Sequence, residues 1–229
     1  MIKKTQTIAA AVIIFLLSSV HIFSQSQKSF AEKVADAYGF SNFKNVKSIS
    51  YSFNVKTKDK TFTRNWYWEP ETNKVIYKGA GKDGKEISYT YTTGSINKND
   101  SLKSFVDARF INDQYWLLFP FHLVWDKKAD ITDEGTRPYP ISKKNSRCIT
   151  VKYPPSAGGY TPGDIFDLYI GKDNLIHEWV YKPGGNAKNQ RAFTWEGYKK
   201  FNGLKISTQH NVADHKFRIW FSDVKVALK

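Results

Sequence analysis

The chain has 229 residues and a formal net charge of +14, and 16% of its residues are aromatic. Its single cysteine, Cys148, excludes an internal disulfide, so packing has to stabilise the fold. The basic residues are spread over predicted turns and strand edges instead of forming a stripe, which argues against a nucleic-acid-binding protein. They leave two readings open: attraction to an anionic partner such as a lipid head group, or lysines that only keep sheet edges soluble.

The N-terminal segment has the three parts of a secretory signal peptide. Lys3 and Lys4 supply the charged start, residues 8–20 form an almost unbroken apolar run, and Ser24 and Ser26 are small residues placed for cleavage. The apolar run is short for a membrane span. There is no cysteine near the expected cleavage site to which a lipid could be attached. We therefore expect a periplasmic or secreted protein that is not lipid-anchored; an uncleaved membrane anchor is the alternative.

We expect the signal peptide to occupy residues 1–26 and one domain with a substantial core to occupy residues 27–229. Residues 29–40 have the spacing of a short amphipathic helix that ends near Gly39. Four segments then alternate between apolar and polar residues and predict an antiparallel meander, with a hairpin turn at residues 83–84. The apolar positions of these four segments lie within residues 49–55, 62–68, 75–77 and 87–91.

A helical segment interrupts the predicted strands. Residues 99–126 have helical periodicity and capping residues at their start, and Pro120 is expected to end or kink the helix. Within this segment, residues 115–125 are the most apolar stretch after the signal peptide and are apolar all round. This stretch is therefore either buried in the protein or faces something apolar that is not protein.

Alternation resumes after a polar loop expected at residues 126–147 and predicts about six more antiparallel strands, the last with a bulge near residues 222–223. So many strands exceed what one flat sheet holds comfortably, so the sheet has to curve. The expected fold class is mainly β (α+β). We predict a strongly curved antiparallel sheet or unclosed half-barrel of about ten to eleven strands, with an N-terminal helix and a helical lid insertion.

No catalytic motif and no metal-ligand spacing is found in the sequence, and we expect no metal and no cofactor. Cys148 opens an alternating segment and is expected to be a buried structural thiol. Asp167, Glu178 and Glu196 sit in successive predicted strands. They fit a hydrolase of envelope glycans only if two of them face each other across an open cleft; otherwise they belong to a solvated surface.

The aromatic residues of the first strands and of the helical segment are the remaining candidates for function. If the two layers pack tightly, these residues are core; if the sheet curves away from the helix, they line a cavity for an acyl chain. The candidate ligand-binding residues are Tyr51, Phe53, Trp66, Trp68, Phe105, Trp116, Phe119, Phe121 and Trp125.

The order of elements resembles the lipoprotein-carrier fold of the LolA and LolB type over nearly the whole mature chain. Residues 115–126 and 194–206 also look like segments of exported Gram-negative proteins without a known activity. The resemblance implies an unclosed barrel with a helical lid that holds lipid acyl chains. LolB-type proteins are lipid-anchored and this chain lacks the cysteine for that, so a soluble LolA-like carrier is the closer analogy.

The predicted function is a periplasmic carrier or sensor that holds an acyl chain in an apolar half-barrel cavity. The expected partners are a lipid or an acylated protein, including anionic head groups, and a transient partner protein of the envelope; we expect a monomer that binds no nucleic acid. Two alternatives stay open: a secreted hydrolase of envelope glycans, and a ligand-free structural or adhesion module with a tightly filled interior.

Overall fold

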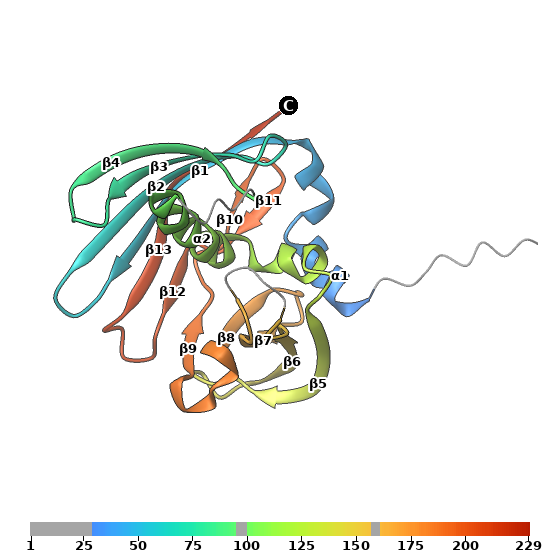
Figure 1. Cartoon of the computed structure of the whole chain (residues 1–229). Helices are drawn as coiled ribbons and strands as arrows, with labels where there is room; N and C mark the ends of the chain where they lie inside the picture. The colour runs from blue at the N-terminus through green and yellow to red at the C-terminus, as the bar shows by residue number, and fades with distance from the viewer. Residues whose placement is uncertain (1–28, 95–99, 157–160) are drawn as a thin grey trace, which may run out of the picture.

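A computed structural model describes residues 29–94, 100–156 and 161–229, and two antiparallel sheets face one long helix in it (Figure 1). The expected signal peptide at residues 1–26 lies outside the described residues. The central helix is α2 (Ser101–Trp125), and the N-terminal helix is α1 (Phe30–Ala37). The short 3-10 turns are η1 (Phe40–Asn45), η2 (Pro183–Gly185) and η3 (Ala187–Asn189).

The larger sheet has six strands in the order β12-β13-β1-β2-β3-β4, and the smaller sheet has five in the order β5-β6-β7-β8-β9. The larger sheet consists of β1 (Val46–Lys56), β2 (Thr61–Glu69), β3 (Lys74–Ala80), β4 (Glu86–Thr92), β12 (Gln209–Asn211) and β13 (Arg218–Leu228). The smaller sheet consists of β5 (Asp130–Pro138), β6 (Asn145–Lys152), β7 (Ile165–Ile170), β8 (Ile176–Lys182) and β9 (Arg191–Thr194). A separate hairpin is formed by β10 (Lys199–Phe201) and β11 (Leu204–Ile206).

The two sheets meet where β9 lies beside β12. The backbone N–H of Asn211 donates to Thr194 Oγ1 at 3.1 Å, and Glu196 forms an isolated bridge with Gln209. Among the described strands, β4 and β5 have one neighbour each, so the combined surface stays open along those edges. The structure confirms a mainly β, unclosed half-barrel with an N-terminal helix and a helical insertion.

Several local predictions are confirmed by the backbone. The turn between β3 and β4 contains Gly84 at φ 81°, which the hairpin signal anticipated. The pairing of β1 with β13 shifts register between Ser50 and Ser52, opposite Asp223 at φ 54°, so the expected bulge is present. Gly39, at φ 86°, separates the N-terminal helix from η1.

The sequence of α2 explains both its start and its bend. Asp100 Oδ1 accepts hydrogen bonds from the backbone N–H groups of Leu102 and Lys103, which caps the helix. Pro120 has no N–H to donate and its ring crowds the preceding turn, and Leu118 departs from helical geometry at φ −126° and ψ 22°. Residues 116–123 are all buried.

In the described part of the chain no helix combines the length and the apolarity that a membrane span requires.

The prediction of a polar loop at residues 126–147 was wrong, because β5 lies there. This strand is the edge of its sheet and is mostly exposed, so its side chains show no apolar alternation. Gly135, at φ 71°, and a register shift between Asp133 and Thr136 break the pattern further. The strands β10 and β12, of three residues each, were also missed because they are too short for a periodic signal.

Candidate ligand-binding groove

Two cavities flank Trp116 on α2 and share Asn112, Trp116 and Tyr181 as lining residues. The small chamber has a volume of about 250 Å³ and the large chamber about 680 Å³. The large chamber falls within the range of roughly 300–1,000 Å³ that is typical of small-molecule sites. We call the two chambers together the groove. It lies between α2 and residues from both sheets, so the half-barrel is not completely filled by its own side chains.

The large chamber has one apolar side and one polar side. Its apolar side consists of Phe53, Val55, Phe193, Phe217 and Ile219, which come from β1, β9, β13 and the turn before β13. Its polar lining includes Arg64, Asn112 and the consecutive residues Lys188, Asn189, Gln190 and Arg191, which run from η3 to the start of β9. None of the described residues that line this chamber is Asp or Glu.

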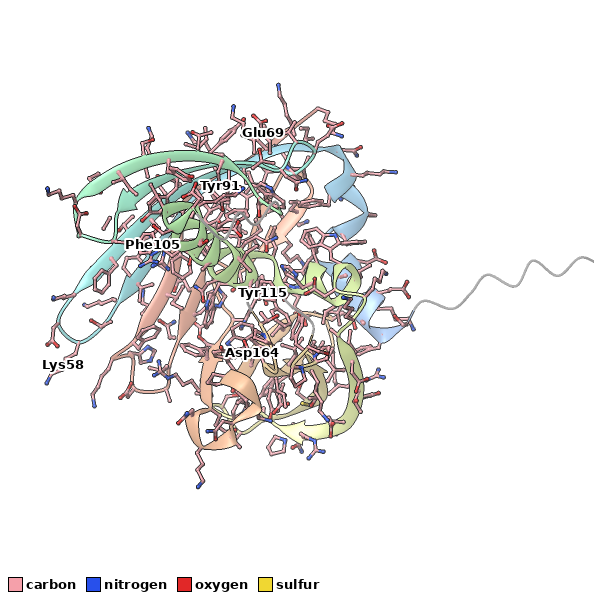
Figure 2. The ribbon with its side chains drawn as sticks, viewed as in Figure 1. Lys58, Glu69, Tyr91, Phe105, Tyr115 and Asp164 are labelled. Atoms are coloured by element: carbon pink, nitrogen blue, oxygen red, sulfur yellow. The ribbon has the colours of Figure 1, made fainter. Side chains whose placement is uncertain are left out.

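The small chamber is more aromatic and carries a carboxylate. Its lining includes Ile111, Phe166 and Trp179, and Figure 2 labels Tyr115 on α2 and Asp164 before β7 at its border. Asp164 is 8% exposed and accepts hydrogen bonds from Tyr181 Oη at 3.1 Å and from the backbone N–H of Gly184 at 2.7 Å. The two chambers therefore differ in charge as well as in volume.

A buried ion pair fastens α2 to the larger sheet next to the groove. Arg64 Nε and Nη2 donate to the two carboxylate oxygens of Asp113 at 2.7 and 2.6 Å, and Trp66 Nε1 donates to Asp113 at 2.9 Å. The Asp113 side chain is 0% exposed, so its charge depends on these donors. Because Asp113 follows Asn112 in the chain, the pair also positions the groove wall.

A second polar cluster fixes the C-terminal end of α2. Asp126 Oδ2 accepts hydrogen bonds from the hydroxyls of Tyr115 at 2.6 Å and Tyr153 at 2.7 Å, and it lies 3.0 Å from His122 Nδ1. Burial raises the pKa of Asp126, but the contacts with His122 and the two tyrosines outweigh burial and hold this pKa below its usual value. The cluster keeps the Tyr115 ring at the border of the small chamber.

Three buried aromatic side chains beneath Trp116 keep ring nitrogens that have no hydrogen-bond partner among the described residues. These are Trp179 Nε1, Trp195 Nε1 and His210 Nε2. His210 Nδ1 lies 3.3 Å from the carbonyl oxygen of Thr194, and burial lowers the pKa of His210 to about 3. A neutral imidazole therefore sits in the interior of the half-barrel.

The structure places the predicted ligand-binding residues in several environments. Phe53 and Trp116 line the large chamber. Trp125 lines a different cleft of about 520 Å³, beside Phe40 and Phe43 of η1. The others pack inside the protein: Tyr51 against Phe221, Trp66 and Trp68 against Phe110, Phe119 against Phe166, Phe121 against Phe40, and half-buried Phe105 under the Arg109 guanidinium.

Sequence reasoning missed other residues of the groove. Phe166, Trp179 and Phe193 alternate within predicted strands, so their inward direction was visible but their position beside a cavity was not. Lys188 lies in η3 and Arg191 is the first residue of β9, and this short stretch has no periodicity that would mark it in the sequence. Only the chain path brings the stretch to the large chamber.

The three candidate carboxylates all take part in structural contacts. Asp167 and Glu178 share one face of the smaller sheet, as alternation suggested, but both are engaged in structural contacts. Asp167 accepts from Lys182 Nζ at 2.5 Å, and Glu178 accepts from the backbone N–H groups of Ile141 and Ser142 at 2.6 and 2.9 Å. Glu196 is exposed, follows β9 and forms its isolated bridge with Gln209 of β12.

Cys148 is 1% exposed and packs with Tyr139, Tyr169 and Val180 in a small cluster separate from the main core. Burial raises the pKa of its thiol to about 12, so little thiolate exists at neutral pH. Within the described ranges, no three His, Cys, Asp or Glu side chains are grouped as a metal site would require.

Comparison with solved structures shows a LolA-like fold. The chain matches a LolA superfamily protein, NE2245 from Nitrosomonas europaea, with a TM-score of 0.51 and 7% identity over 87% of this chain and 94% of that one. A DUF1329 family protein from Desulfovibrio piger matches with a TM-score of 0.44 and 11% identity, covering 87% and 94% of the two chains. A MucB structure matches with a TM-score of 0.32 and 14% identity, over 87% of this chain and 60% of that one. No protein-family model and no curated protein matches the chain.

Proposed function

From a LolA-like fold with a groove on its helical insertion, we propose that this protein is a periplasmic carrier or sensor that holds an acyl chain. Residues 1–26 act as the signal peptide, and residues 27–229 work as one monomeric domain. The ligand is a lipid or an acylated protein. The acyl chain lies against α2 and passes Trp116 from one chamber to the other.

The observation that carries this proposal is the aromatic lining on both sides of Trp116. Of the residues that the sequence nominated, Phe53 and Trp116 contact the chain, together with Ile111, Phe166 and Phe193. Of the other candidates, Tyr51, Trp66, Trp68, Phe119 and Phe121 support the groove from the core, and the partly buried Phe105 and Trp125 pack against that core. Each methylene buried there contributes roughly 0.8 kcal/mol, so a long chain binds well without any specific polar contact.

The proposal is tested by native mass spectrometry of protein purified without detergent from a periplasm, followed by organic extraction of the bound material. A stoichiometric lipid mass supports an acyl carrier. A ligand-free mass that persists after incubation with envelope lipids contradicts it and favours a structural module.

A cavity-filling variant locates the site. Ala108 is a half-buried residue of α2 that lines the small chamber, so Ala108→Trp places an indole in the path of the chain. Ala213→Trp adds the same ring at an exposed turn and serves as the control. We expect Ala108→Trp to lose the co-purifying lipid while keeping the circular dichroism spectrum, and Ala213→Trp to retain it. Equal lipid content in the two variants would place the ligand elsewhere.

A further inference from the structure

We propose that the groove selects acyl ligands with an anionic head group, phosphate or carboxylate, which Lys188 and Arg191 hold at the mouth of the large chamber. This inference rests on the proposed function and adds the chemistry of the ligand's polar end. It depends on the charge distribution along the groove and on which of its cations already have a partner.

Three cationic residues line the large chamber, and they are not equivalent. The Arg64 guanidinium is committed to Asp113 by two hydrogen bonds, at 2.7 and 2.6 Å. Lys188 and Arg191 are exposed, and no ion pair joins either of them to a carboxylate in the described part of the chain. Two cations with free charge therefore border an apolar chamber whose described lining contains no acidic residue.

The backbone that carries these two cations is held in place. The side chain of Asn186 accepts a hydrogen bond from the backbone N–H of Lys188 at 2.9 Å, which caps η3. Arg191 is the first residue of β9 and pairs with Tyr181 on β8. The two side chains thus start from ordered positions three residues apart, beside the large chamber.

The small chamber of the groove carries the opposite charge. Asp164, with its two hydrogen-bond donors, borders the small chamber, where an anion would meet a buried carboxylate. The charge distribution therefore gives the ligand a direction. The head group lies at Lys188 and Arg191, and the acyl chain runs across the aromatic wall and past Trp116 toward the small chamber.

Four palmitoyl probes test this inference, each titrated below its micelle concentration and followed by isothermal titration calorimetry. They are neutral monopalmitoylglycerol, zwitterionic lysophosphatidylcholine, anionic lysophosphatidylglycerol and palmitate. We expect at least one anionic probe to bind about tenfold more tightly than the neutral and zwitterionic probes, and this preference to decrease as salt is added. The tighter of the two anionic probes identifies phosphate or carboxylate as the preferred group.

Two double variants, each of which removes two positive charges, are compared with the wild-type protein. Lys188→Gln combined with Arg191→Gln is expected to abolish the anionic preference while leaving the affinity for monopalmitoylglycerol unchanged. Lys78→Gln combined with Lys225→Gln removes two charges from exposed positions of β3 and β13 and is expected to keep the preference.

The outcomes separate the two proposals. If the wild-type protein binds all four probes equally, or if both double variants lose the preference alike, the head-group site is overturned and the acyl carrier stands. If no probe binds at all, the acyl carrier itself fails, and the head-group site fails with it.

Discussion

His210 makes the stability of this protein depend on pH in a range where carboxylates contribute little. The imidazole is 0% exposed and is surrounded by the rings of Trp116, Trp195 and Phe221. Its Nδ1 lies 3.3 Å from the Thr194 carbonyl oxygen, and among the described residues no carboxylate stabilises an imidazolium at this position. Protonation of His210 is therefore unfavourable in the folded protein.

The size of the effect follows from the pKa of His210. This pKa is about 3 in the folded protein and about 6.5 in the unfolded chain. Between these values the unfolded chain binds the additional proton, so the free energy of unfolding is largest above pH 6.5 and falls as the pH decreases. At about 1.36 kcal/mol per pKa unit, the loss is about 2 kcal/mol at pH 5 and about 4 kcal/mol at pH 3, where the folded protein also begins to take up the proton.

Urea denaturation at pH 7 and pH 5, followed by circular dichroism, measures this loss. We expect the wild-type protein to lose about 2 kcal/mol between the two values from this group, and His210→Gln to be less stable at pH 7 but to lose about 2 kcal/mol less. The control is His215→Asn, because His215 is exposed at φ 55° and asparagine tolerates that conformation. A decrease of equal size in the wild-type protein and in His210→Gln would refute the assignment of a buried neutral imidazole.

Three further predictions concern stability and reactivity. Arg64→Leu leaves the Asp113 carboxylate buried without its cation, so urea denaturation should show that the free energy of unfolding falls by about 3–5 kcal/mol. The double variant Arg64→Leu with Asp113→Leu should restore part of this loss. A double variant less stable than the single one would contradict the prediction. Gly39→Ala should lower Tm more than Gly84→Ala, although both glycines have φ above 80°. The new Cβ at residue 39 would lie 2.1 Å from the backbone carbonyl oxygen of Gly203, whereas the new Cβ at residue 84 would meet nothing within 4 Å. Equal shifts in Tm would contradict this prediction. The Cys148 thiol should react with a disulfide reagent at pH 8 far more slowly in the folded protein than in urea; equal rates would show that the thiol is accessible.

The sequence predicted the parts of the fold that depend on periodicity. The four strands of the first meander, the kink near Pro120 and the bulge opposite Ser50 and Ser52 all follow from local spacing, from the missing proline N–H or from a change of phase. The apolar stretch within α2 was predicted to be buried or to face an apolar ligand. The structure shows that it is buried, with a cavity on either side of Trp116.

The groove itself was beyond local reasoning, because periodicity tells which side of a strand faces inward but not how completely the space there is filled. Phe119 and Phe121 are as apolar as Trp116, yet they pack in the core while Trp116 borders two cavities. The difference is set by distant elements, since Phe193 of β9 and Ile219 of β13 reach the same chamber only through the curvature of the sheets. The basic side of the chamber depends equally on the path of the turn before β9.

The polar character of β5, which removed apolar alternation from its sequence, also makes this edge of the half-barrel a poor template for pairing with another strand. A sheet that does not close leaves an edge whose N–H and C=O groups are available to another chain. On β5 that edge carries charged side chains held in ion pairs, Asp133 with Arg147 and Glu134 with Arg137, and it ends at Pro138. A bulge at Gly135 bends the strand away from a straight template. A β5 redesigned with regular apolar alternation would be easy to recognise in the sequence, but its exposed edge would then be prone to pair with a strand of a second molecule.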